Sequence, residues 1–142
     1  MNYYAFMLFK PHRPKTAVRV ETDAAPRLEP AAGRGGGGRG GQQQPEPPPD
    51  LSLSASRQGS EMVLTFVNPR HDVDMDVDCA LRGASARQGK AQILHDADIN
   101  AYNSFDNPDR IVIKPHEVSA EGARVRITLP SMSVATVTLQ LA

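Results

Sequence analysis

Four aspartates at every second position, Asp72, Asp74, Asp76 and Asp78, are the residues whose spacing most directly suggests chemistry, namely calcium binding. An EF-hand loop that starts at Asp72 needs glycine at its sixth position and glutamate at its twelfth. Those positions hold Val77 and Gly83, so the motif fails at both. The alternation instead predicts the solvated face of a β-strand, with carboxylates about 6.7 Å apart. Basic neighbours would offset their repulsion, and Arg124 and Arg126 are candidates.

The remaining titratable residues do not form a recognisable catalytic or metal-binding motif. The four histidines lack ligand spacing and are interpreted as surface or loop residues: His12, His71, His95 and His116. A glycosidase needs two carboxylates on opposite sides of the scissile bond, and no motif places such a pair among the glutamates Glu21, Glu29, Glu46, Glu61, Glu117 and Glu121. Neither a Gly-x-Ser-x-Gly motif nor a P-loop is present. We therefore assign no catalytic, metal-binding or cofactor-binding residue, and we expect no cofactor.

The segment ILHDADINAYNSFDNP, residues 93–108, is unusually dense in Asp and Asn. Such side chains bond to nearby backbone groups, so the segment predicts a shaped, self-bonded loop that covers the end of the fold. Four apolar residues are expected to be buried: Ile93, Leu94, Ile99 and Phe105. An alternative is an interface role, for which the candidate residues are Asp98, Asn100, Asn103, Phe105, Asn107 and Pro108.

The elements that must position this loop are predicted to be strands. Period-two patterns separated by turns predict an all-β fold, an antiparallel β-sandwich. Strands are expected over residues 17–22 (Val18 and Val20 inward), 51–56, 62–67, 73–79, 91–94, 111–113, 125–129 and 134–141. Gly83 and Gly89 are expected to bracket a loop, and the last two strands to form a hairpin. The apolar start, MNYYAFMLF, predicts a short helix that ends near Pro11.

Composition divides the chain into three zones. Residues 1–23 are apolar and then alternating, residues 51–142 hold most of the strand patterns, and residues 24–50 are rich in Gly, Gln and Pro. The middle zone is predicted to be a disordered low-complexity linker because it offers little apolar surface to bury. Its Gly-Arg run, residues 33–41, leaves open a weak RNA interaction, but it has no interleaved aromatic residue and a flexible linker is the favoured interpretation.

Length and charge limit the possible functions. The chain has 142 residues, one domain by the usual prior, and is too short for a (β/α)8 barrel of about 200 residues or more. The formal net charge is zero, which gives no reason to expect nucleic acid or an anionic membrane as partner. Cys79 is the single cysteine, so no intrachain disulfide can form. Without a signal peptide or a membrane-length apolar run, we expect a cytoplasmic chain.

Three segments together resemble the C-terminal domain of family 51 α-L-arabinofuranosidases. Residues 93–108 are similar to that family's Asp- and Asn-rich loop, and LPSMSVATVTLQL is similar to its closing strand. Near the start, Tyr4, Phe9, Lys10 and His12 match a helix pattern that joins the family's barrel to its sandwich. Two features depart from the family: His95 replaces a small polar residue, and the Gly/Pro-rich zone replaces a short connection.

The resemblance implies a jelly-roll-like sandwich whose parent enzyme removes terminal α-L-arabinofuranosyl residues, as part of L-arabinose metabolism. That enzyme would use a retaining mechanism with two glutamates on a preceding barrel and no cofactor. The barrel would be this chain's partner, arabinose-containing oligosaccharides would be reached only through it, and a homo-oligomer is possible. In this interpretation residues 1–23 are the remnant of the barrel-closing helix plus a first strand, and residues 51–142 are the sandwich. The chain, as a fragment, should be inactive alone.

Two functions of other classes remain open. A carbohydrate-binding module would present exposed aromatic rings to sugars, but the chain has no Trp, and residues 51–142 offer only Phe66, Tyr102 and Phe105. A protein-interaction or RNA-associated module would use the Gly-Arg run.

Overall fold

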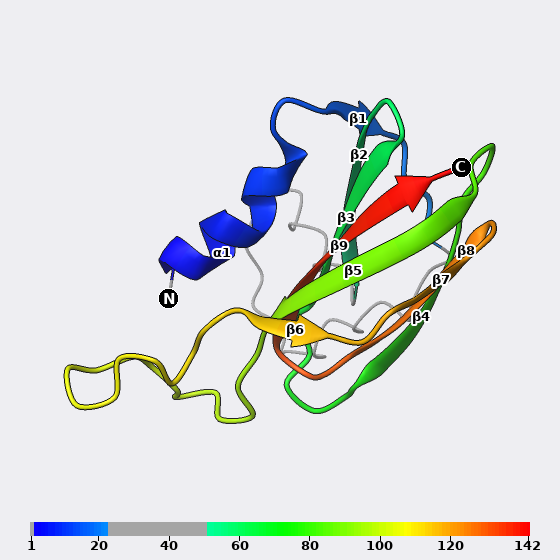
Figure 1. Ribbon diagram of the computed structural model, residues 1–142. Coiled ribbons are helices and arrows are strands. Elements are labelled where there is room, and N and C mark those ends of the chain that lie inside the picture. Colours follow the sequence, from blue (N-terminus) through cyan, green and yellow to red (C-terminus); the bar gives the residue numbers. More distant parts are fainter. Residues whose placement is uncertain (1, 23–50) are drawn as a thin grey trace, which may run out of the picture.

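The computed structural model describes residues 2–22 and 51–142, so the predicted linker, residues 24–50, lies outside the described residues (Figure 1). Strands make up 49% of the structure, which confirms the all-β class. The elements are the helix α1 (Asn2–Phe9), the short 3₁₀ turn η1 (Lys10–His12), and the strands β1 (Thr16–Val18), β2 (Ser52–Gln58), β3 (Glu61–Asn68), β4 (Met75–Ala80), β5 (Ala86–Leu94), β6 (Lys114–His116), β7 (Ser119–Glu121), β8 (Arg124–Leu129) and β9 (Ser133–Leu141).

The strands form two antiparallel sheets that face each other. The larger sheet has the order β1-β2-β3-β9-β5-β6, and the smaller has the order β4-β8-β7. In Figure 1 the smaller sheet lies beneath β5 and β9, and α1 lies apart from it on the other side of the larger sheet. The predicted antiparallel sandwich is therefore confirmed.

The main core lies between the two sheets. Phe66 of β3, Val125 and Leu129 of β8, and Val137 of β9 are fully buried there. Along β8 the alternation is strict, with Val125, Ile127 and Leu129 buried and the residues between them exposed. This pattern is what a strand with one face on the core requires, and it is why β8 could be predicted from sequence.

Strand β3 is buried on both faces because the N-terminal segment covers its outer side. Leu8 of α1 packs into a second apolar cluster with Leu94, Ala101 and Ile111. The helix ends at Phe9, before Pro11, as predicted. The N-terminal helix is thus part of the fold rather than an appendage. No helix in residues 2–22 and 51–142 has the length and apolarity needed to cross a membrane.

The predicted hairpin between the last two strands is wrong. β8 belongs to the smaller sheet, whereas β9 lies between β3 and β5 in the larger sheet. The connection crosses from one sheet to the other: the Met132 amide donates to Arg70 O at 2.7 Å, and the Ser131 amide donates to Asp74 Oδ1 at 2.8 Å. Two alternating strands joined by a short turn look the same in sequence whether they pair or arch between sheets.

Three smaller predictions also fail. β1 is only Thr16–Val18, and Val18 is exposed because this edge strand faces no second sheet. Residues 111–113 are not a strand, and the short pairing with β5 falls at β6 instead. Gly89 lies within β5 rather than ending a loop, because that position is crowded by the neighbouring sheet.

Candidate interface site

The candidate loop, residues 95–113, leaves the larger sheet after β5 and returns at β6. In Figure 1 it projects beyond the sandwich on the side where α1 lies. Its two ends are fixed by apolar contacts, since Leu94 and Ile111 are buried together with Leu8. The region between these anchors is held by polar contacts.

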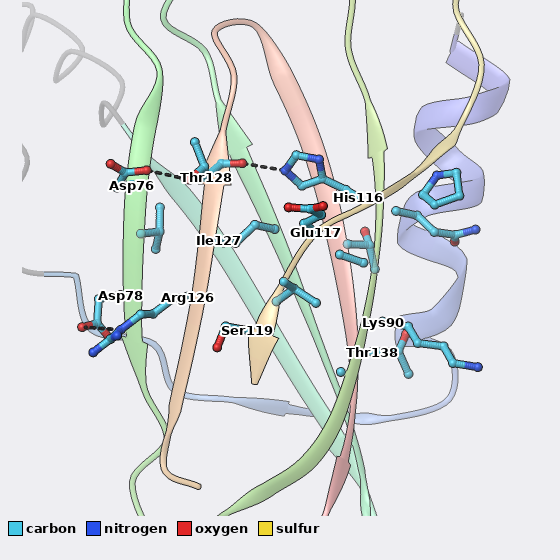
Figure 2. Close-up of a pocket in the computed structure, with 17 residues that line it drawn as sticks. Asp76, Asp78, Lys90, His116, Glu117, Ser119, Arg126, Ile127, Thr128 and Thr138 are labelled. Carbon is cyan, nitrogen blue, oxygen red and sulfur yellow. Dashed lines mark hydrogen bonds and ion pairs between the residues drawn. The ribbon is translucent and has the colours of Figure 1, made fainter. Parts of the chain in front are cut away.

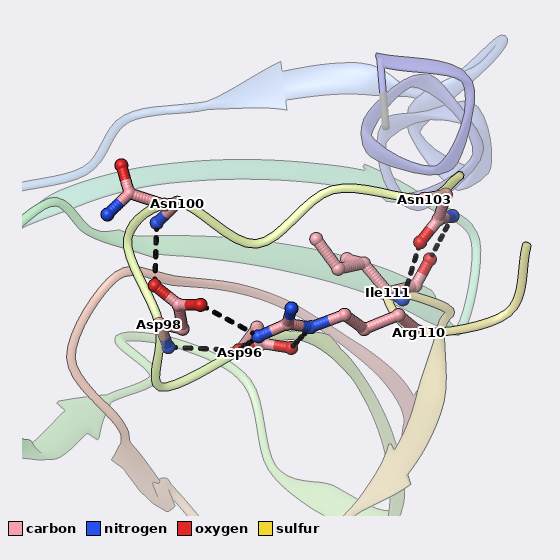
Figure 3. A network of polar contacts seen from close by, with 6 residues as sticks. All are labelled: Asp96, Asp98, Asn100, Asn103, Arg110 and Ile111. Carbon is pink, nitrogen blue, oxygen red and sulfur yellow. Dashed lines mark hydrogen bonds and ion pairs between the residues drawn. The ribbon is translucent and has the colours of Figure 1, made fainter. Parts of the chain in front are cut away.

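Arg110 binds the first turn of the loop (Figure 3). Its Nε donates to Asp96 Oδ2 at 3.1 Å, and its terminal nitrogen donates to Asp98 Oδ2 at 2.9 Å. The same two carboxylates also accept backbone amides two residues ahead, at Asp98 and Asn100, both at 2.9 Å. The hydrogen bonds from Arg110 hold the pKa of Asp96 below its ordinary value. One arginine therefore closes two consecutive Asx turns.

Asn103 fixes the middle of the loop. Its Nδ2 donates to Ile111 O at 2.9 Å, and its Oδ1 accepts the Ile111 amide at 2.7 Å (Figure 3). The side chain thus takes the place of a paired strand residue. At the tip, Ser104 and Asn107 exchange two bonds: the Ser104 amide donates to Asn107 O, and the Asn107 amide donates to Ser104 Oγ. These contacts confirm the prediction of a self-bonded loop.

The six candidate interface residues are arranged unequally. Asn103 is half-buried, whereas the other five are exposed: Asp98, Asn100, Phe105, Asn107 and Pro108. The expected burial holds for Ile93 and Leu94 and is wrong for Ile99 and Phe105, which are 71% and 106% exposed. The loop's own polar bonds turn these two side chains outward.

Helix α1 packs against this loop. Leu8 of the helix packs on Ala101 and Ile111, so helix and loop share one apolar cluster. Outside that cluster, both segments expose large apolar side chains, a surface that we call the helix–loop face: Tyr3, Phe6, Met7, Phe9, Ile99, Tyr102 and Phe105. Large exposed apolar side chains on neighbouring segments are typical of a protein–protein contact.

The histidines are not equivalent. His71 is exposed, as predicted for a surface residue. His116 Nε2 donates to Thr128 O at 2.6 Å, and the Nδ1 of His95 is buried with no hydrogen-bond partner among the described residues. His12 is half-buried between Ser56 Oγ at 2.6 Å and Thr65 Oγ1 at 2.8 Å. The interpretation as a surface residue is wrong for His12, because a contact 44 residues away in sequence leaves no local signal.

Two residues of the aspartate ladder, Asp76 and Asp78, line an open groove of about 1500 Å³ (Figure 2). Asp78 pairs with Arg124 and, at 3.5 Å, with Arg126, which confirms the expected basic neighbours. Asp76 accepts a hydrogen bond from the Thr128 hydroxyl at 2.6 Å. Among the described residues, no three His, Cys, Asp or Glu side chains are grouped to hold a metal ion. Asp76 and Asp78 are thus both engaged in contacts within the chain.

A family model described as "Alpha-L-arabinofuranosidase C-terminal domain" matches residues 1–133. No curated protein matches the sequence. Among solved structures, a GH51 arabinofuranosidase from Xanthomonas axonopodis pv. citri is 20% identical with a TM-score of 0.75, covering 97% of this chain and 26% of that one. The fold is therefore shared over almost the whole of this chain.

Two further solved structures are similar over about two thirds of the chain. A thermostable GH51 α-L-arabinofuranosidase from Thermotoga petrophila is 23% identical with a TM-score of 0.60, covering 67% of this chain and 20% of that one. A family 51 enzyme from Bifidobacterium longum is 21% identical with a TM-score of 0.61, covering 68% and 19% respectively. This chain spans about a quarter or less of the length of these proteins.

Proposed function

The chain belongs to the α-L-arabinofuranosidase C-terminal domain family, and on this premise we propose that it is the sandwich domain against which a catalytic (β/α)8 barrel packs. The parent enzyme would remove terminal α-L-arabinofuranosyl residues by a retaining mechanism, with both catalytic glutamates on the barrel. Arabinose-containing oligosaccharides would meet the barrel and not this domain.

The helix–loop face supports this proposal. It gathers seven large exposed apolar side chains on one helix and one loop, and a shared cluster around Leu8 holds the two segments together. The comparison is consistent with such a partner, because this chain covers only 26% of the Xanthomonas protein. We therefore propose that the barrel covers the helix–loop face.

Within this face the loop residues would have distinct roles. Phe105 and Pro108 would contact the barrel, together with the exposed polar groups of Asp98, Asn100 and Asn107. Asn103, which is half-buried, would shape the loop. Residues 1–23 would join the barrel to the sandwich of residues 51–142. The proposal includes a cytoplasmic enzyme of L-arabinose metabolism, a location that the single cysteine favours.

A domain exchange tests the proposal. The C-terminal domain of the Xanthomonas enzyme is replaced by this chain, and hydrolysis of 4-nitrophenyl α-L-arabinofuranoside is measured. We expect a soluble chimera with activity, and no turnover from the isolated chain. In the chimera, Phe6→Ser combined with Phe105→Asp should lower the melting temperature because both side chains would lose apolar contacts with the barrel.

Two controls make the exchange decisive. A chimera rebuilt with the native Xanthomonas domain shows that the junction itself is harmless. Val73→Ser changes an exposed apolar residue that is not part of the helix–loop face, so it should leave the melting temperature unchanged. If the rebuilt enzyme is active while this chain gives no active chimera, or if the Phe6 and Phe105 changes behave like Val73→Ser, the proposed docking is wrong.

A further inference from the structure

The junction between α1 and the larger sheet is polar at its centre. Ser56 of β2, Thr65 of β3 and Thr136 of β9 point to the outer face of that sheet, yet they are only 4%, 1% and 3% exposed. Their cover is the end of α1 and the turn η1, where His12 lies. Buried hydroxyl groups need partners, so each of these three side chains is expected to take part in a hydrogen bond at this junction.

The bonds form a single directed chain. The Thr136 hydroxyl donates to Leu8 O at 2.9 Å, which satisfies a carbonyl in the last turn of α1. Thr136 has no second hydrogen, so Thr65 must donate in their 2.9 Å contact. Thr65 can then only accept from His12 Nε2. The neutral ring therefore carries its proton on Nε2, and its bare Nδ1 accepts the Ser56 hydroxyl.

We propose that neutral His12 is a pH-sensitive latch that holds α1 and η1 on the larger sheet, and that protonation of its ring loosens this attachment. Protonation would turn Nδ1 into a donor, and the Ser56 hydroxyl would have to reverse. The hydrogen of the Ser56 hydroxyl would then lack an acceptor, because the His12 ring is the only hydrogen-bond partner of that hydroxyl among the described residues. An unsatisfied polar group in a buried position destabilises the packed state.

The charge of Lys15 also favours the neutral ring of His12. The N-terminal segment around the ring carries Lys10, Arg13 and Lys15, β2 carries Arg57 and β3 carries Glu61, whereas β9 has no charged residue. Glu61 is paired with Lys15 at 2.7 Å. Burial and, secondly, the charge of Lys15 lower the pKa of His12 from its ordinary value of 6.5.

The pKa of His12 is lower in the folded state, so the neutral ring stabilises the attachment of α1 above pH 6.5. That stabilisation is lost as the pH falls toward the lowered pKa. Each unit of lowering corresponds to a tenfold change in the equilibrium between attached and released helix. This latch concerns contacts within the chain and does not depend on the proposed barrel.

Hydrogen exchange on the full chain tests the latch. Protection factors, corrected for the intrinsic pH dependence of exchange, are measured for amides of α1 and for β9 at pH 7.5 and 5.0. We expect α1 protection to fall severalfold at pH 5.0 while β9 stays protected. Nitrogen NMR shifts of the His12 ring should show the Nε2-protonated tautomer at pH 7.5. An Nδ1-protonated ring, or α1 protection that is unchanged by pH, would overturn the proposal.

Two variants separate the latch from general acid effects. His12→Gln keeps an Nε2 donor for Thr65 but cannot titrate, so α1 protection should become independent of pH. His71→Gln removes an exposed histidine and should leave the wild-type pH dependence intact. If His12→Gln still loses α1 protection at pH 5.0, another group is responsible and the inference is wrong.

Discussion

Individual Asp and Asn side chains of residues 95–113 hold the backbone in place. Asp96 and Asp98 each accept an amide two residues ahead, which is a local habit of these residue types and could be predicted from their density. Arg110 and His12 were not predicted because their partners lie 12 and 14 residues away for Arg110 and 44 and 53 away for His12. Sequence alone does not show which distant groups the fold brings together.

Asn103 and Asn100 make a matched pair for testing whether the side-chain hydrogen bonds stabilise the loop. Asn103→Ala leaves the Ile111 amide and carbonyl without their side-chain partners, which should cost about 1–3 kcal/mol of the free energy of unfolding. Asn100→Ala should change it by less than about 0.5 kcal/mol, since only the Asn100 backbone is bonded. Urea unfolding followed by circular dichroism measures both variants, and equal losses would contradict the assigned role.

Strand alternation predicted most elements but not their partners. β8 shows a clear period of two, and its position was predicted closely, yet its neighbours are β4 and β7 rather than β9. The position of Gly89 was also not predictable from the strand pattern. Glycine ordinarily suggests a turn, but Gly89 lies within β5, where β7 of the opposite sheet comes close. Both misassignments concern contacts between the two sheets, which leave little pattern within one strand.

Gly89 of β5 lies where Ala120 of β7 comes very close. A Cβ at this position would lie 2.8 Å from Ala120 Cβ and 3.1 Å from Leu139 Cδ2, so Gly89→Ala should destabilise the domain by about 1–3 kcal/mol. Leu139 can shift its flexible end, whereas the Ala120 Cβ is fixed to the backbone of β7. The clash with Ala120 should therefore dominate.

A double mutant checks which clash matters. Ala120→Gly removes the opposing methyl group, so the Gly89→Ala, Ala120→Gly double variant should lose less unfolding free energy than the sum of the two single changes. The four proteins are compared by urea unfolding. Strict additivity would mean that β5 and β7 do not meet as closely as the structure shows.

The whole molecule combines a well-packed sandwich with exposed apolar side chains on α1 and on the loop of residues 95–113. The core residues between the sheets are almost completely buried, whereas Phe6, Tyr102 and Phe105 remain mostly exposed. The sequence indicated the apolar helix but placed Ile99 and Phe105 inside, because an apolar side chain in a loop gives no sign of which way it points. Their exposed fractions in the structure, 71% and 106%, show that these side chains face outward.

The exposed helix–loop face should make the isolated chain self-associate. Apolar side chains that no barrel covers can be buried only against another molecule, and Phe6 and Phe105 are among the most exposed of them, at 78% and 106%. Analytical ultracentrifugation of the isolated chain over rising concentration should show the average mass increase above 15.4 kDa.

Phe6→Ser combined with Phe105→Ser should hold the mass near the monomer, with an unchanged melting temperature because neither side chain is packed in the core. Val73→Ser, an exposed apolar change outside the helix–loop face, should associate like the unmodified chain. If the unmodified chain is monomeric at every concentration, the face does not associate in solution; if Val73→Ser also prevents association, the contact involves another surface.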